Sequence, residues 1–166
     1  GIGLLYSSKK NSRVNIETQI EGGGHENGLR SGTLPVPVIV GFAKAGEISF
    51  KKQKFEYSLL GKLRNKLLDG IKNKHPDIIL NGSLDTKMSH NLNLCFPNLE
   101  AETMIMRMKG VACSMGSACS SATLKPSHVI KALGIDSELA HSAIRFSVGR
   151  FTTNDDISNA INEIKK

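Results

Sequence analysis

Ser-Ala-Ile-Arg-Phe-Ser-Val, at residues 142–148, has the alternation of a β-strand with one buried face. Arg145 and Ser147 then lie on the polar face. The apolar side chains share the other face: Ile144, Phe146 and Val148. A helix is predicted over residues 153–164, because cap residues and acidic residues open it. A strand followed directly by a helix predicts an α/β domain.

The residues before this strand extend the predicted domain back to Pro76. This proline ends a long helical pattern, because proline cannot continue a helix. Leu92, Leu94 and Phe96 then alternate with polar residues, as in a second strand. Between Pro76 and the quoted stretch we predict strands at 78–80, 91–96 and 111–113 and helices at 99–109 and 126–133. Residues 76–166 are therefore predicted to form a small α/β domain.

A long helical region is predicted upstream, over residues 36–75. Pro35 and Pro37 open it, and prolines are favoured at the start of helices. Apolar residues then recur at every fourth position, which is the spacing of one helix face. The recurring residues are Phe55, Leu59, Leu63, Leu67 and Ile71. We expect this helix to connect two parts of the chain.

Residues 1–35 read as the end of a different domain. They contain two strand patterns, at 2–6 and 14–20, and then a glycine-rich stretch. So few residues cannot bury a core of their own. We therefore expect this segment to belong to a larger domain, most of which lies upstream of Gly1, and the absence of an initiator Met agrees with that.

The composition excludes several classes of function. The net charge is +7, but there is no Trp and there are only two Tyr, so stacking of nucleic-acid bases is not expected. No apolar run approaches the roughly 20 residues that span a bilayer, so no membrane segment is predicted. The basic charge suits anionic ligands such as phosphates, carboxylates or an acidic protein partner.

Three cysteines, without paired spacing, indicate a reducing compartment rather than a disulfide framework. Cys119 lies among Gly, Ser and Ala at residues 114–122, so bulky neighbours do not cover its sulfur. A thiolate there could act as a nucleophile. The alternative is a small core cysteine in a turn, and that alternative fits Cys95 and Cys113 better because both lie in apolar strand patterns.

Two further stretches predict anion binding. Glycine-rich residues 22–33 could place successive N–H groups and Thr33 around a phosphate, next to a helix start; the alternative is a surface turn. Arg145, on the polar face of its strand, could hold a carboxylate with two hydrogen bonds; the alternative is a structural salt bridge. The spacing of the histidines does not indicate a metal site. His75 is expected to be exposed to solvent.

Together these stretches resemble the pyridoxal-phosphate-dependent cysteine desulfurases of iron–sulfur cluster assembly, in the class V aminotransferase group. The matching residues follow the family order: Gly1-Ile2-Gly3, then Gly22-Gly23-Gly24-His25-Glu26 with Arg30-Ser31-Gly32-Thr33, then Gly116-Ser117-Ala118-Cys119, then Ala140-His141-Ser142 with Ile144-Arg145-Phe146-Ser147. This order implies the C-terminal portion of a fold-type I transferase. That portion comprises the last strands of the large domain, a long connecting helix and the small C-terminal domain.

The resemblance also implies residue roles. Cys119 matches the nucleophile that takes sulfur from L-cysteine as a persulfide. The resemblance also implies a transient contact of this persulfide with an iron–sulfur cluster. Thr33 matches a threonine that reaches the cofactor phosphate of the other subunit in a dimer. Arg145 matches the arginine that holds the substrate carboxylate. The lysine, histidine and aspartate that hold pyridoxal phosphate would lie upstream of Gly1, so the isolated chain is expected to be inactive.

Two positions depart from the family pattern, and two alternatives remain open. Asn27 stands where an arginine is common, and the chain stops at Lys166, before the usual tail. A selenocysteine lyase shares the fold, although the Gly-Ser-Ala-Cys loop favours a desulfurase. A non-catalytic split-gene fragment would bind a partner chain or a scaffold. The resemblance implies an iron–sulfur scaffold or another sulfur acceptor as partner, and the bacterial cytoplasm or the mitochondrial matrix as location.

Overall fold

The computed structural model describes residues 1–8, 10, 15–115 and 127–164. The chain divides into two compact units, Gly1–Gln53 and Lys54–Lys166. The long helix α1, Val36–Lys74, contributes its first half to one unit and its second half to the other. The predicted segment boundaries at residues 35 and 75 stay predictions.

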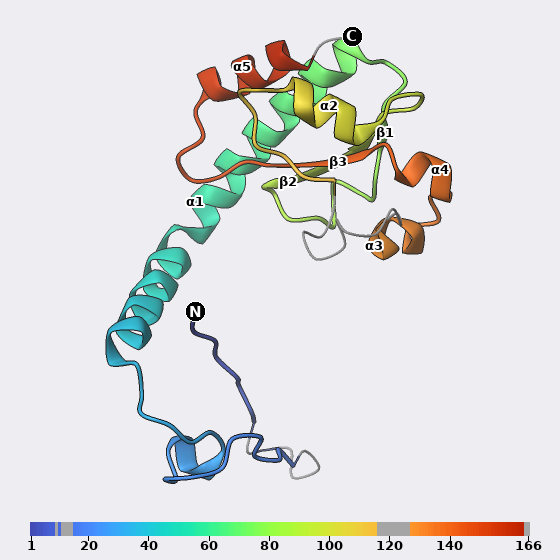
Figure 1. Ribbon diagram of the computed structural model, residues 1–166. Coiled ribbons are helices and arrows are strands. Elements are labelled where there is room, and N and C mark those ends of the chain that lie inside the picture. Colours follow the sequence, from blue (N-terminus) through green and yellow to red (C-terminus); the bar gives the residue numbers. More distant parts are fainter. Residues whose placement is uncertain (9, 11–14, 116–126, 165–166) are drawn as a thin grey trace. The chain divides into compact units, whose positions relative to one another are not determined.

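A small antiparallel sheet organises the second unit (Figure 1). Its strand order is β1-β2-β3, so the central strand is β2. Leu94 of β2 lies opposite Ile144 of β3, and Leu92 lies opposite Phe146. The strands are β1 (Ile79–Leu80), β2 (Asn91–Cys95) and β3 (Ala143–Ser147). The strands predicted at 78–80, 91–96 and 142–148 are therefore confirmed, apart from terminal residues.

One face of the sheet carries the main core. Leu92 and Ile144 are 1% and 0% exposed, as the alternation predicted. They belong to one buried cluster with Leu67 and Ile71 of α1 and with Ile157 of α5. The helices of this layer besides α1 are α2 (Ala101–Arg107) and α5 (Asn154–Glu163). Burial of a leucine or isoleucine side chain stabilises the fold by about 1.5–3 kcal/mol.

The helices α1 and α5 approach closely at Gly70. A Cβ placed on Gly70 would lie 2.3 Å from Cδ1 of Ile161, which is well inside van der Waals contact. Glycine therefore fits this point of the long helix because it has no side chain. The start of α5 is fixed by a reciprocal cap, in which Thr153 and Asp156 bond to each other's backbone N–H groups.

A second, smaller cluster lies on the other face of the sheet. Cys95 and Ala143 are buried there with Ile130 and Ala140. The covering helices are α3 (His128–Ala132) and α4 (Ser137–Ala140). The helix predicted at 126–133 is confirmed over the residues that the structure describes, whereas α4 had no counterpart among the predicted elements. The Asp136 side chain caps α4 by accepting a hydrogen bond from the Leu139 N–H.

The helix α1 runs unbroken for 39 residues, so the predicted long helix is confirmed. Its predicted apolar stripe holds over its last turns, where Leu63, Leu67 and Ile71 are buried. At the other end of the stripe, Phe55 is 70% exposed. A four-residue repeat marks one helix face, but burial depends on a neighbour that packs there.

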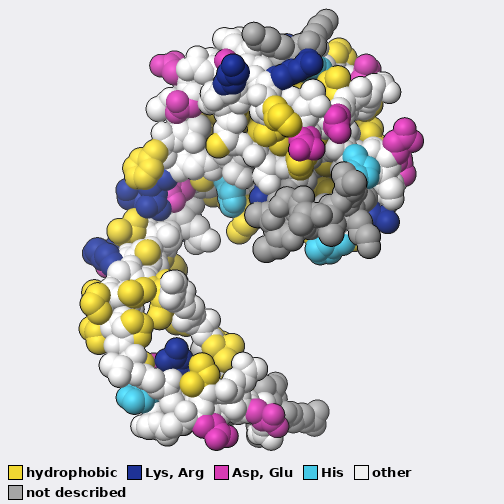
Figure 2. Space-filling model, in the orientation of Figure 1, with side chains coloured by type: hydrophobic (Ala, Val, Ile, Leu, Met, Phe, Trp, Pro, Cys, Tyr) yellow, Lys and Arg dark blue, Asp and Glu magenta, His cyan; other side chains and the backbone are white. Residues whose placement is uncertain are grey.

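The first unit has almost no interior. Among its described residues Ser31 is the one buried side chain. Figure 2 shows apolar side chains on the surface of the first half of α1, where Val36 and Phe50 are 59% and 84% exposed. A single 3₁₀ turn, η1 (Glu26–Gly28), stands out from irregular chain before α1.

The strands predicted at 2–6 and 14–20 do not form in the described residues, and that prediction was wrong. An alternating sequence becomes a strand when a neighbouring strand accepts its backbone hydrogen bonds, and the described part of this unit provides none. The strand predicted at 111–113 is absent too, although Ser114 forms an isolated bridge. No helix in the described part of the chain is long and apolar enough to cross a membrane.

His75 was predicted to be exposed, and the structure contradicts this. It is half-buried, and its ring packs edge-on against Phe96 with the ring centres 5.6 Å apart. Its Nε2 atom is enclosed and makes no hydrogen bond within the described residues. Helix α1 ends at Lys74, before Pro76, and His75 directly after the helix packs against Phe96 directly after β2.

Candidate functional site

Arg145 lies on the polar face of β3, as its sequence pattern predicted. Its neighbours Ile144 and Phe146 are buried, whereas Arg145 itself is exposed. The guanidinium makes no ion pair with any carboxylate in the described residues, so the alternative of a structural salt bridge receives no support there. An exposed, unpaired arginine is available to an external carboxylate.

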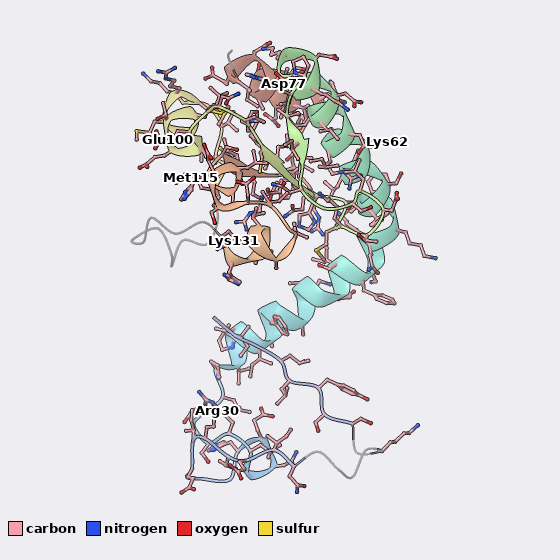
Figure 3. All side chains as sticks on the ribbon, turned by 90° about the vertical axis from the view of Figure 1, so that its right-hand side faces the viewer. Arg30, Lys62, Asp77, Glu100, Met115 and Lys131 are labelled. Atoms are coloured by element: carbon pink, nitrogen blue, oxygen red, sulfur yellow. The ribbon has the colours of Figure 1, made fainter. Side chains whose placement is uncertain are left out.

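The backbone of Arg145 is bonded to Ser114. The Arg145 N–H donates to the Ser114 carbonyl at 2.7 Å, and the Ser114 N–H donates to the Arg145 carbonyl at 3.1 Å. Ser114 therefore continues the sheet by one residue beyond β3. Met115 follows it and is the last described residue before Cys119 (Figure 3). This pair of hydrogen bonds attaches Ser114, five residues before Cys119, to β3.

On its other side, Arg145 lies opposite Asn93 of β2. In an antiparallel pair, the N–H and C=O groups of one residue point to the same neighbour. Arg145 directs both to Ser114, so its pairing with Asn93 is the closer, non-hydrogen-bonded type, with a Cα separation of about 4.5 Å. The side chains of Asn93, Arg145 and Ser114 therefore form a row across one face of the sheet.

A network of hydrogen bonds holds the side chain of Asn93 in place. Asn81 is 3% exposed, and its Nδ2 donates to Asn93 Oδ1 at 2.6 Å and to Cys95 Sγ at 3.1 Å. Lys87 Nζ donates to the Asn81 carbonyl at 2.7 Å. Burial and the neighbouring Arg64 guanidinium lower the pKa of Lys87. Asn81 is thus held on three sides and fixes the orientation of the Asn93 amide.

The sequence interpretation did not single out Asn93, Asn81 or Ser114. The same alternation that identified Arg145 contained a signal for Asn93, because it places Asn93 on the polar face of its strand. The contact of Asn81 with Asn93 and that of Ser114 with Arg145 join residues 12 or more positions apart, and no local pattern reveals them.

The three cysteines occupy different positions. Cys95 is fully buried, and Cys113 is half-buried against the main core, as predicted for both. Burial raises the pKa of the Cys113 thiol, which lowers its thiolate fraction at neutral pH. Cys119, the predicted nucleophile, lies outside the described residues, and its role stays a prediction.

The glycine-rich stretch forms a tight loop. Gly24 and Gly28 have φ angles of +74° and +81°, which favour glycine. Asn27 has a φ of 56°, and asparagine tolerates this left-handed conformation better than most residues. Thr18 Oγ1 closes the loop by donating to the Gly28 carbonyl at 2.9 Å.

Thr33 is exposed at the end of this loop, three residues before α1 begins. Within the described residues, the N–H groups of Gly32 and Thr33 and the Thr33 hydroxyl donate no hydrogen bond. The start of α1 offers less, because Pro37 has no N–H and Val38 donates to the Pro35 carbonyl. The loop can therefore present three adjacent donors to a phosphate.

Thr33 and Arg145 belong to different compact units. Within the part of the chain that the structure describes, no group of three or more His, Cys, Asp or Glu side chains could hold a metal ion.

The aminotransferase class-V family model matches residues 1–159. The chain belongs to the aminotransferase class-V family. Among curated relatives in this family, the cysteine desulfurase IscS of Vibrio cholerae is 50% identical over 165 residues, covering 99% of this chain and 40% of the relative. The IscS of Klebsiella pneumoniae is 50% identical over 166 residues, covering 100% of this chain and 41% of the relative. The chain thus spans about two fifths of these relatives.

Comparison with solved structures gives the same result for the fold. A NifS-like protein matches with a TM-score of 0.79 and 32% identity, over 92% of this chain and 39% of that protein. SspA in complex with cysteine matches with a TM-score of 0.56 and 28% identity, over 82% of this chain and 37% of SspA. The predicted fold is confirmed: this α/β chain is part of a fold-type I transferase.

Proposed function

We propose that this chain is the C-terminal portion of a pyridoxal-phosphate-dependent cysteine desulfurase. The observation that carries the proposal is the pair of backbone hydrogen bonds between Ser114 and Arg145. It fastens the start of the cysteine stretch beside an exposed arginine that is available to a carboxylate. A substrate amino acid held by Arg145 would then lie next to the segment that carries the nucleophile. Relatives named cysteine desulfurase support this assignment.

Arg145 would bind the α-carboxylate of L-cysteine. Its guanidinium can form two parallel hydrogen bonds with a carboxylate, which orient the substrate as well as hold it. The buried face of β3 keeps the backbone of Arg145 in place, because Ile144 and Phe146 are locked into the core. The arginine is therefore presented from a rigid strand, and Ser114, five residues before Cys119, is bonded to that strand.

Cys119 would accept the sulfur. Its thiolate attacks the substrate sulfur, an S–S bond forms, and the C–S bond of the substrate breaks. The electron pair of that bond remains on the substrate carbon, which takes up a proton and leaves as L-alanine. The balance is L-cysteine plus a protein thiol giving L-alanine plus a protein persulfide.

Pyridoxal phosphate, when bound, supplies the electron sink for the substrate carbon. The donors of this chain that fit its phosphate are the N–H groups of Gly32 and Thr33 and the Thr33 hydroxyl. They are exposed, so they are suited to a cofactor held by another subunit of a dimer. The lysine that binds the cofactor is proposed to lie in the upstream portion that the relatives contain.

The persulfide would pass to an iron–sulfur scaffold or another sulfur acceptor, and contact with an iron–sulfur cluster would be transient. The proposed location is the bacterial cytoplasm or the mitochondrial matrix. Exposed apolar side chains such as Phe50 also fit a fragment that needs a partner chain. A selenocysteine lyase is the related alternative, and it predicts a preference for selenocysteine over cysteine.

The test compares two samples. One is the complete enzyme, meaning this chain joined to the upstream portion that its relatives contain, supplied from the Vibrio cholerae relative where needed. The other is residues 1–166 alone. With pyridoxal phosphate and L-cysteine, the complete enzyme should release alanine and carry a persulfide on Cys119, and the isolated chain should do neither. A complete enzyme without alanine release, or with turnover of selenocysteine alone, would overturn the proposal.

A further inference from the structure

We infer that Asn93 is a second substrate-binding residue, which donates a hydrogen bond to the carboxylate that Arg145 holds. This inference rests on the proposed function and adds a specificity-determining contact to it. Asn93 and Arg145 are directly opposite each other on β2 and β3. Their side chains project from the same face of the sheet, since the intervening positions Leu94 and Ile144 are buried on the other face.

The two side chains are close because of the hydrogen bonds to Ser114. Since Arg145 uses its N–H and C=O on the Ser114 side, the Asn93–Arg145 pair is the narrow type. Side chains of such pairs start about 4.5–5.5 Å apart at Cβ. A carboxylate that the Arg145 guanidinium holds over this face of the sheet would therefore lie beside the Asn93 amide on the neighbouring strand.

The amide of Asn93 has a donor to give. An asparagine amide has one acceptor oxygen and two N–H donors. The Oδ1 atom of Asn93 accepts from Asn81 at 2.6 Å, which orients the amide. Its Nδ2 atom makes no hydrogen bond with any residue that the structure describes. The oriented amide therefore presents N–H donors beside Arg145, and both groups favour a negatively charged ligand.

The Asn81 amide sets this orientation of the Asn93 amide. Both hydrogens of its Nδ2 are used, one for Asn93 and one for Cys95. The Cys95 thiol in turn donates to Asn81 Oδ1 at 3.4 Å, so both amide atoms of the buried Asn81 have partners. In this arrangement the network presents the amide nitrogen of Asn93 beside Arg145. An oxygen at that position would repel a carboxylate.

Two substitutions at one position separate a binding role from a structural one. Asn93→Asp keeps an oxygen that accepts from Asn81, but it replaces the free donor with a negative charge beside Arg145. Asn93→Ala removes both contacts. If the role of Asn93 is purely structural, Asn93→Asp should be closer to wild type than Asn93→Ala. If Asn93 binds the carboxylate, Asn93→Asp should be the more damaging of the two.

The experiment uses the complete enzyme and measures KM and kcat for L-cysteine. We expect KM to rise about ten-fold in Asn93→Ala, the size of one hydrogen bond to a charged group, and further in Asn93→Asp, with a smaller change in kcat. Asn91→Ala is the control, because Asn91 lies two residues away on the same strand and face, opposite Ser147. It should leave KM unchanged.

A binding measurement removes the dependence on turnover. The dissociation constant of L-alanine should rise in both Asn93 variants, while that of L-alaninamide, which lacks the carboxylate, should change little. A wild-type KM in Asn93→Asp, or equal weakening for L-alanine and L-alaninamide, would overturn the inference. An inactive wild-type enzyme would instead overturn the proposed function, so the two failures are distinguishable.

Discussion

Ser114 and Arg145 exchange two backbone hydrogen bonds, at 3.1 and 2.7 Å, at the outer edge of β3. These hydrogen bonds connect, through the backbone, the strand that carries Arg145 and the segment that leads to Cys119. The arginine is presented by a strand, and Ser114, which precedes Cys119 by five residues, is held at the edge of that strand. A change in the conformation of one of these two segments should therefore alter the position of the other.

Replacing Cys119 should remove persulfide formation. In the complete enzyme, Cys119→Ser lacks the attacking sulfur, so alanine release should fall at least 100-fold while the cofactor remains bound. The matched control is Cys113→Ser, since Cys113 is half-buried and packs against the core. Alanine assays and mass spectrometry of the persulfide measure both variants. Full activity in Cys119→Ser would contradict the assignment.

The pH dependence of Cys113 provides a second prediction. Burial raises the pKa of its thiol, so below that raised pKa the protonated form dominates. Iodoacetamide should therefore label Cys113 slowly at neutral pH, and the rate should increase as the pH rises through the shifted pKa. Peptide mapping after timed labelling measures this rate. Labelling of Cys113 as fast as a free cysteine at pH 7 would show that the thiol is not shielded.

Removal of the Arg145 side chain should weaken substrate binding. A charge-assisted hydrogen-bond pair is worth about 1.5–3 kcal/mol, so Arg145→Ala should raise KM for L-cysteine by about ten-fold or more. Arg107→Ala on α2 is a suitable control, because Arg107 is an exposed arginine outside the sheet. If KM stays the same in the folded variant, Arg145 has a structural role.

Thr33 offers a test of the cofactor assignment. Thr33→Val keeps the shape of the side chain but removes its hydroxyl, so the cofactor dissociation constant of the assembled dimer should rise about three- to ten-fold. Thr18→Val is an informative comparison, since the Thr18 hydroxyl closes the glycine-rich loop. It should affect the cofactor only through the loop. Titration of the cofactor by its absorbance measures both variants.

Gly70 allows a stability test in the isolated chain. The Cβ of Gly70→Ala would overlap Ile161, and overpacking of this kind costs about 1–3 kcal/mol. Gly61→Ala is the control on the same helix, where the nearest atom to an added Cβ is 3.9 Å away. That variant should be neutral or more stable, by up to about 1 kcal/mol. Urea unfolding of both variants gives the comparison, and equal midpoints would contradict the close approach of α1 and α5.

Local patterns predicted the elements that later pack against each other. Alternation at Leu92 and Ile144 identified the buried face of the sheet, and Pro76 marked the end of the long helix. In each case the signal lies within a few residues of the element. The polar face that contains Arg145 followed from the same alternation, which is why one residue of the candidate site could be placed from sequence.

Features that depend on distant partners could not be predicted in this way. The expected strand at residues 2–6 requires a neighbouring strand that the described unit does not contain. The exposure of Phe55 depends on what packs beside α1, and the burial of His75 depends on Phe96, which is far away in the sequence. The support of Asn93 by Asn81 is similarly non-local, so it became visible only in three dimensions.

The burial of Cys95 has a consequence for chemical fidelity. A protein that transports reactive sulfur must prevent that sulfur from being trapped on an unintended thiol. Cys95 is 0% exposed, and its sulfur is engaged by Asn81. Exchange between a persulfide and this thiol would require α3 and α4 to move away from this face of the sheet. The core thus insulates one thiol from a reaction proposed to take place on another, in the same small domain.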